Sequence, residues 1–337
     1  MKKTLIIITA VVVIFIILLT VFRDSITNKD EKITKSYWPN DAQLVISFSM
    51  QFETGGQSEG AESPFSGNPL PKGQPDLPAE SWFRYGANEG VGRMLNLWKK
   101  YDIHVTSHVV GEAAIKYPEL AKAIADGGHE IAAHGIAWSD QWGLSYEDEL
   151  AFIKKGIDTV EAITGQRGIG YNCNWLRRSP NTLKVLQDLG FLYHIDDVSR
   201  DEPFVTMVRG KKFVVMPYVL RNNDIVNIAG KNWSPDQFLA QLKAEFDQLY
   251  EEGNHKRRMM SISLHDRIGG APAVVHVVDE FIQYAKQHKG VVFMRKDDIA
   301  KMIKNDPNTP IDNSEIKYNI MTNEGKNSCS FDNLIRK

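Results

Sequence analysis

Cysteine is nearly absent from this 337-residue chain, which contains only Cys173 and Cys329. Two cysteines so far apart are too few for a disulfide framework or a structural zinc cluster. An excess of charge of one sign is also missing, because 40 basic residues face 42 acidic ones. A protein that binds nucleic acid phosphates usually carries a clustered basic excess, so the composition argues against nucleic acid as a partner.

Long apolar runs are missing as well, with one exception at the N-terminus. Thr4–Phe22 is an uncharged run of 19 residues, close to the ~20 that cross a bilayer as a helix. Lys2 and Lys3 precede it and favour a cytoplasmic N-terminus. We predict an uncleaved single-pass anchor with the rest of the chain on the non-cytoplasmic side. A cleavable signal is the alternative, although no small-x-small site precedes Arg23, and it also predicts export.

Composition divides the rest of the chain into three parts. After the anchor or signal segment, 1–23, we expect a polar linker over 24–40, a folded part over 41–305 and a mobile polar tail over 306–337. Within the folded part, short apolar runs alternate with amphipathic stretches. We predict strands at Gln43–Phe48, Ile103–Val110, Glu130–Ala133, Phe191–Ile195, Phe213–Met216, Met260–Leu264 and Val291–Phe293. We predict helices at Ala87–Tyr101, Glu112–Ala125, Ser145–Thr164, from Ser179-Pro180 onward, and at Ser234–Glu252, Ala273–Gln287 and Asp297–Ile303.

Alternating strands and helices predict an α/β fold with a parallel sheet and helices outside it. Over roughly 270 residues, a closed or nearly closed (β/α) barrel fits best. An open doubly wound sheet is the alternative, but the glycine-rich dinucleotide fingerprint of that fold does not follow the first predicted strand. In a barrel of this kind, chemistry lies at the carboxyl ends of the strands.

Three chemically active residues directly follow predicted strands. Glu53 comes after the first strand, before two glycines, while His134 and His265 follow two later ones. A carboxylate near two imidazoles can activate water and protonate a leaving nitrogen, which favours hydrolysis. Glutamate with two histidines is also a plausible zinc-binding set with one open position. The spacing alone does not choose between these hypotheses.

Seven segments together resemble the polysaccharide deacetylase (NodB-homology) family, and most closely its allantoinase-like subgroup. The segments occur in the family's order and cover nearly all of residues 40–305. They are ISFSMQFETGG (46–56), WFRYGANEGVGRM (82–94), GGHEIAAHGIAW (127–138), TGQRGIGY (164–171), MPYVLRNND (216–224), MSISLHDRIGG (260–270) and GVVFMRKDDIA (290–300). The resemblance implies a distorted (β/α) barrel that hydrolyses non-peptide carbon–nitrogen bonds.

Two departures from the family's metal-dependent members bear on the chemistry. Gln51 stands at the position of the general base, and Trp138 stands where a second metal-binding histidine is expected. An indole nitrogen only donates and cannot hold a cation. The allantoinase-like subgroup shares both changes, so the resemblance implies catalysis without a tightly bound metal. We therefore expect no cofactor, and a zinc held by Glu53, His134 and His265 is the alternative.

The resemblance also implies roles for the remaining candidates. Glu53 would be the acid or base, with His134 and His265 as proton carriers or oxyanion stabilisers. Arg177 and Asp224 match substrate-site positions of the subgroup. Substrate-binding candidates are Gln51, Trp138, Arg177, Asp224 and Arg267. The expected substrate is an N-acetylated carbohydrate or a cyclic ureide. The alternative is a catalytically silent, glycan-binding barrel at the cell surface. The sequence does not determine the oligomeric state of the protein in either case.

Overall fold

The computed structural model describes residues 37–57, 63–64, 68, 70–71 and 73–314. Its centre is one nine-stranded, largely parallel sheet. The strands are β1 (Leu44–Phe52), β2 (Thr106–Val109), β3 (Glu130–Ala133), β4 (Gly170–Tyr171), β5 (Tyr193–His194), β6 (Phe204–Val208), β7 (Lys211–Val215), β8 (Met259–His265) and β9 (Val291–Phe293). Their order in the sheet is β6-β7-β5-β4-β3-β2-β1-β8, and β9 pairs with β1.

The sheet is curled but does not close into a barrel. Within the described residues, β6 and β8 stand at opposite ends of the order, and β6 runs antiparallel to β7. A closed barrel would need these outer strands to pair with each other. The fold is therefore a curled α/β half-barrel, which confirms the α/β class and corrects the expectation of a closed or nearly closed barrel.

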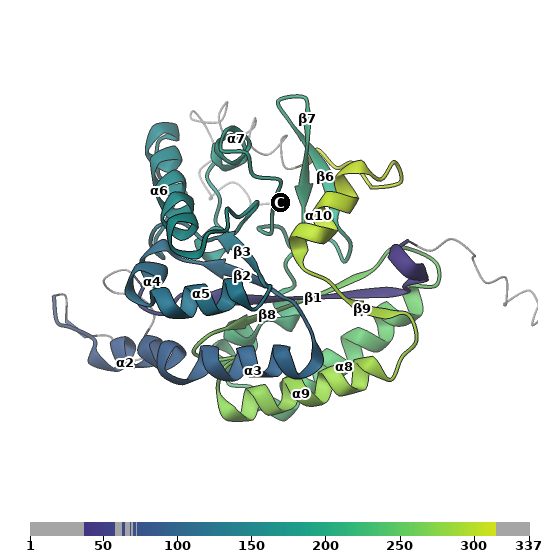
Figure 1. The fold of residues 1–337 in the computed structure, drawn as a ribbon, viewed down its shortest axis with the longest axis horizontal. Helices are drawn as coiled ribbons and strands as arrows, with labels where there is room; N and C mark the ends of the chain where they lie inside the picture. Colours follow the sequence, from purple (N-terminus) through teal and green to yellow (C-terminus); the bar gives the residue numbers. More distant parts are fainter. Residues whose placement is uncertain (1–36, 58–62, 65–67, 69, 72, 315–337) are drawn as a thin grey trace, which may run out of the picture.

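Helices cover the outside of this sheet (Figure 1). Ser234 caps the first turn of α8 in a capping box with Gln237, and the buried face of α8 includes Phe238, Leu242 and Phe246. This spacing of four residues is the amphipathic pattern that the sequence showed. The helices are α2 (Leu77–Tyr85), α3 (Val91–Tyr101), α4 (Gly111–Lys116), α5 (Pro118–Asp126), α6 (Tyr146–Thr164), α7 (Thr182–Asp188), α8 (Pro235–Glu252), α9 (Pro272–Lys286) and α10 (Lys296–Asn305).

Strand β1 lies in the interior of the sheet, and the candidate site lies at its carboxyl end. All nine of its residues are buried, as expected for a parallel strand covered on both faces. The register aligns Gln51 with His265 on β8 and with His108 on β2. Since these strands are parallel, their carboxyl ends meet at one edge of the sheet.

Glycines bring a π-helix close to the loop after β8. The π-helix Gly86–Gly90 joins α2 to α3. A Cβ atom on Gly86 would stand 2.6 Å from Asp266 Oδ1, and one on Gly90 would stand 1.9 Å from the Asp266 carbonyl oxygen. Only residues without a side chain permit this approach.

Several elements differ from the prediction. The helix expected at Glu112–Ala125 is divided into α4 and α5, because Pro118 starts a new helix and Tyr117 before it leaves the helical conformation. Strand β6 was missed, and α7 begins at Thr182 rather than at Ser179-Pro180.

Both ends of the described chain pack on the sheet. Trp38, in the predicted linker, is buried and donates through its indole to the carbonyl of Arg258 at 3.0 Å. In the predicted mobile tail, the Val205 amide donates to Pro310, and the Asp312 amide donates to Val205. Pro310 and Asp312 therefore contact β6, and the mobile tail predicted over 306–337 stays a prediction.

The predicted anchor, 1–23, and residues 315–337 of the predicted tail lie outside the described residues. Among the residues that the structure describes, no helix combines the length and apolar character that a membrane crossing requires.

Candidate functional site

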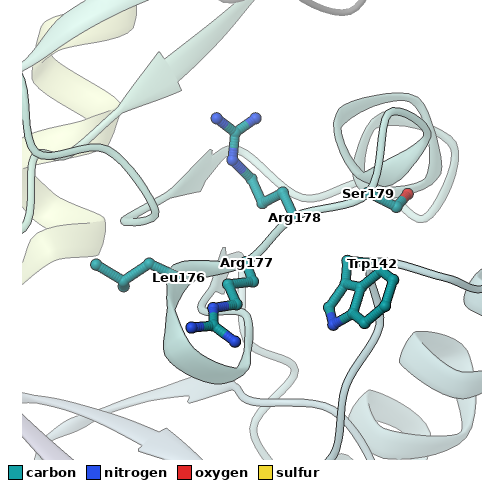
Figure 2. Close-up of a pocket in the computed structure, with 5 residues that line it drawn as sticks. All are labelled: Trp142, Leu176, Arg177, Arg178 and Ser179. Atoms are coloured by element: carbon teal, nitrogen blue, oxygen red, sulfur yellow. The ribbon is translucent and has the colours of Figure 1, made fainter. Parts of the chain in front are cut away.

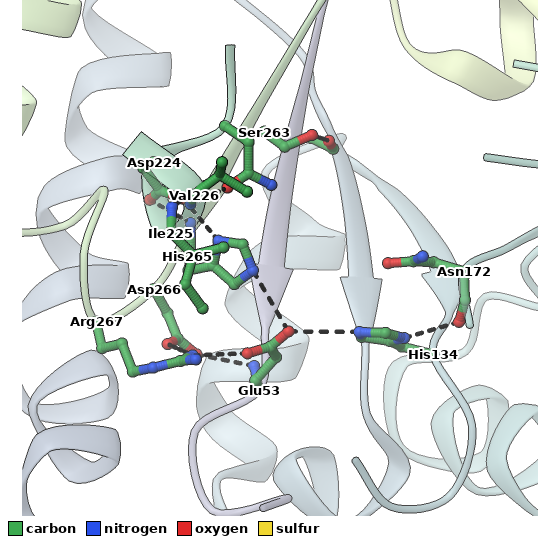
Figure 3. A network of polar contacts seen from close by, with 12 residues as sticks. Glu53, His134, Asn172, Asp224, Ile225, Val226, Ser263, His265, Asp266 and Arg267 are labelled. Atoms are coloured by element: carbon green, nitrogen blue, oxygen red, sulfur yellow. Dashed lines mark hydrogen bonds and ion pairs between the residues drawn. The ribbon is translucent and has the colours of Figure 1, made fainter. Parts of the chain in front are cut away.

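The three residues chosen from the strand ends meet in one place (Figure 3). Glu53 Oε1 lies 3.4 Å from His134 Nε2 and 3.7 Å from His265 Nε2. All three side chains are buried, and only 2% of Glu53 is exposed. They come from the ends of β1, β3 and β8, so the parallel sheet assembles the cluster from segments far apart in sequence.

A backbone carbonyl fixes the orientation of His134. Its Nδ1 lies 2.7 Å from the carbonyl oxygen of Asn172, which can only accept a hydrogen bond. Nδ1 therefore carries a proton, and Nε2 is the nitrogen that faces Glu53 Oε1 at 3.4 Å.

The carboxylate of Asp224 fixes the orientation of His265. Asp224 Oδ1 lies 2.6 Å from His265 Nδ1, and Asp224 Oδ2 accepts the backbone N–H of His265 at 2.7 Å. Burial by itself lowers the pKa of His265, but the charges of Asp224 and Glu53 more than offset it, so the net pKa is raised. The protonated ring is thus favoured, and it can act as an acid.

Arg267 holds the other oxygen of Glu53. Its Nη1 donates to Glu53 Oε2 at 2.6 Å, and its guanidinium lies 4.1 Å from the ring centre of Phe83 and 4.9 Å from that of Trp82. Burial tends to raise the pKa of Glu53, but the neighbouring His265 and Arg267 cations hold it well below its usual range. Glu53 is therefore favoured as an anion that stabilises the neighbouring positive charges, and the acid or base role expected from the sequence stays a prediction.

Asp266 fixes the backbone beneath this cluster. Its Oδ2 accepts the backbone N–H groups of Glu53 and Thr54, both at 2.9 Å. Burial raises the pKa of Asp266 to about 6, against the lowering effect of the Arg267 cation. Asp266, which packs against the glycines of the π-helix, therefore also positions Glu53.

A small cavity of about 70 Å³ opens beside the cluster. Gln51 lines it with a side chain that is 1% exposed and whose two amide atoms have no hydrogen-bond partner among the described residues. Trp138 forms part of the wall, 5.7 Å from Trp175 between ring centres. The lining residues are Gln51, Glu53, His134, Trp138, Asn172, Cys173, Trp175, Leu176, Tyr218, Leu220, Asn223, Ile225, Val226 and His265.

The candidates predicted to bind substrate therefore divide into three groups. Gln51 and Trp138 line the cavity. Asp224 and Arg267 do not line it, because they are bound behind His265 and Glu53 and position those side chains. Arg177 lies in a neighbouring pocket with Trp142 (Figure 2).

Sequence reasoning missed the role of Asn172. Its contribution is a main-chain carbonyl, which any residue supplies, so residue type gave no signal.

The donor set does not fit a bound metal. Among the residues that the structure describes, no group of three or more histidine, cysteine or acidic side chains is arranged to hold one. One Glu53 oxygen is already bound to the Arg267 cation, which would repel a metal ion. Trp138 adds an indole that cannot bind a cation.

Comparisons with known proteins agree with this architecture. The family model described as polysaccharide deacetylase matches residues 79–194. The solved structure of Puue allantoinase is 33% identical, has a TM-score of 0.73, and aligns over 80% of this chain and 93% of its own. A structure titled "probable polysaccharide deacetylase" from Pseudomonas aeruginosa PAO1 is 33% identical, with a TM-score of 0.74 and coverage of 82% and 95%. Peptidoglycan deacetylase of Helicobacter pylori is 24% identical over 250 residues, which are 64% of this chain and 84% of that protein.

Proposed function

Because this chain belongs to the polysaccharide deacetylase family of hydrolases, we propose that it hydrolyses a non-peptide carbon–nitrogen bond in an N-acetylated carbohydrate or a cyclic ureide. The observation that carries the proposal is the meeting of two imidazoles at one carboxylate beside a cavity. His134 Nε2 and His265 Nε2 lie 3.4 Å and 3.7 Å from Glu53 Oε1, and the raised pKa of His265 favours its protonated form. Amide hydrolysis requires both a base and an acid.

Each step of the reaction uses one of these groups. His134 Nε2 takes a proton from water as the water oxygen attacks the amide carbonyl carbon. His265 stabilises the resulting oxyanion and then gives its Nε2 proton to the leaving nitrogen as the carbon–nitrogen bond breaks. Glu53 stabilises the positive charge that passes between the two rings, and needs no proton of its own.

Gln51 would bind the amide group of the substrate. A buried primary amide without partners leaves both a donor and an acceptor unused, which costs free energy in the absence of a ligand. A substrate amide offers the complementary acceptor and donor. We propose that Gln51 holds the reacting group and Trp138 forms the wall against it.

The test is turnover by the full-length protein, with a chelator and with added zinc in parallel. We expect acetate release from chitooligosaccharides or ring opening of allantoin, at rates that the chelator does not change, because the site does not fit a metal. His265→Ala serves as the inactive control. Activity only with zinc would contradict the metal-free mechanism and support the Glu53, His134 and His265 zinc alternative. Glycan binding without turnover would favour the silent, glycan-binding barrel.

For localisation, we propose an anchored protein whose catalytic part lies outside the cytoplasm. The uncharged run Thr4–Phe22 supports this, because its length matches a bilayer-spanning helix. We expect the full-length chain to remain with membranes after an alkaline wash and to be accessible to protease from the non-cytoplasmic side. A soluble product with a new N-terminus near residue 25 would show that the segment is a cleaved signal instead.

A further inference from the structure

A second, larger pocket adjoins the catalytic cavity. It has a volume of about 460 Å³ and is lined by Trp142, Leu176, Arg177, Arg178 and Ser179 (Figure 2). Leu176 also lines the catalytic cavity, so the two spaces share one wall. The small cavity has room for a reacting group, and the larger one has room for the remainder of a ligand.

The shared wall is a strained turn. Asn174–Leu176 forms a short 3₁₀ turn in which Trp175 has φ of 53° and Leu176 has φ of 60°. Bulky residues rarely adopt this left-handed conformation, and strain of this kind concentrates at ligand sites. Trp175, which lines the catalytic cavity, is 43% exposed.

The two arginines after this turn have different surroundings. Figure 2 shows their side chains pointing in opposite directions. Arg178 is half-buried, and burial raises the pKa of Asp196 against the lowering effect of the Arg178 charge. Arg177 is exposed and has no acidic partner among the residues that the structure describes. The second pocket thus presents an uncompensated guanidinium beside Trp142, which is 57% exposed.

We propose that this pocket binds a carboxylate on the substrate, so that the enzyme acts on acidic amides. The proposal rests on the proposed function and extends it from a bond type to a substrate class. A planar guanidinium binds a carboxylate through paired hydrogen bonds, and the indole of Trp142 supplies an apolar surface for the carbon skeleton beside it. One ligand would then span both spaces, with its amide at Gln51 and its carboxylate at Arg177.

Two pairs of compounds test this class with the full-length protein. N-acetylmuramic acid differs from N-acetylglucosamine by a carboxylate-bearing ether, and hydantoin-5-acetic acid differs from hydantoin by a carboxymethyl group. We expect the acidic member of at least one pair to have the higher kcat/KM. Arg177→Ala should raise its KM about ten- to hundredfold, as expected for a lost charge-assisted hydrogen bond, with little change for the neutral member.

Matched variants distinguish carboxylate binding by Arg177 from a general effect of the protein's net charge. Arg177→Lys should recover part of the KM effect, because it keeps the charge but not the planar geometry. Lys155→Ala changes the net charge as Arg177→Ala does, at an exposed position on α6, and should leave KM unchanged. Equal losses for both members of a pair in Arg177→Ala would overturn the proposal.

Calorimetry of the same compounds distinguishes this proposal from the proposed function. If no compound is turned over but an acidic one binds more tightly, and Arg177→Ala abolishes the difference, the carboxylate pocket stands and the hydrolase assignment fails. If amides are hydrolysed with no preference for acidic members, the hydrolase assignment stands and the carboxylate pocket fails.

Discussion

Replacing Glu53 by Gln is expected to lower kcat/KM by about 10²- to 10³-fold, the usual effect of losing one preorganised electrostatic group. The amide keeps the size of the side chain but removes the negative charge that Arg267 and the two imidazoles share. Steady-state rates on the best substrate from the screen give the measurement.

The pH profile of the same variant tests the mechanism. The raised pKa of His265 keeps the wild-type ring protonated to higher pH than an ordinary histidine, and activity should fall as pH rises through that pKa. Removing the Glu53 charge lowers the pKa of His265. The alkaline limb of the Glu53→Gln profile should therefore move to lower pH. An unchanged limb with a reduced rate would contradict the role given to Glu53.

A second variant guards against loss of the fold. Glu53→Gln removes the carboxylate that Arg267 Nη1 binds at 2.6 Å, and breaking a buried ion pair by changing one partner is strongly destabilising. The double variant Glu53→Gln/Arg267→Gln removes both charges together. We expect its free energy of unfolding to be closer to that of wild type, while its kcat/KM stays as low as that of Glu53→Gln. Full activity in this folded double variant would exclude an electrostatic role for Glu53.

Replacing Gly90 by Ala is expected to destabilise the protein by about 1–3 kcal/mol or more, the range for overpacking. The new Cβ would stand 1.9 Å from the Asp266 carbonyl oxygen and 3.5 Å from Gly270 Cα, and neither backbone atom can rotate away. Since Asp266 accepts the backbone N–H of Glu53, its displacement should also lower kcat/KM. Urea unfolding and steady-state rates give the two measurements.

Gly92→Ala is the matched control two residues along the chain. Gly92 is exposed on α3, and a Cβ there meets no atom within 4 Å. Alanine is favoured over glycine inside a helix by up to ~1 kcal/mol, so this variant should be slightly more stable than wild type and equally active. Similar losses in both variants would show that the close approach to Asp266 does not matter.

Short strands in the α/β alternation were the elements that the sequence predicted best. The strands expected at Glu130–Ala133 and Val291–Phe293 are confirmed residue for residue, because each is a short apolar run. The family assignment is confirmed as well. Strand β6 was missed because it is an outer, antiparallel strand that does not follow the α/β alternation.

The directions of loop side chains were not predictable in the same way. Arg267 is a substrate-binding candidate in the sequence. In the structure it turns to Glu53 and packs on the ring of Phe83 in α2. Adjacency along a chain fixes which strand end a residue belongs to, but its side-chain direction depends on packing partners that are distant in sequence.

The pairing of β1 also constrains how the chain folds. Its N-terminal half lies between β8 and β9, and its C-terminal half lies between β2 and β8. The β8 and β9 partners are separated from it by most of the folded sequence, and non-local pairings of this kind slow folding. During synthesis, β1 therefore lacks its β9 partner until residues near Phe293 have left the ribosome. We expect aggregation through the unpaired edges of this strand to be most favourable during that interval.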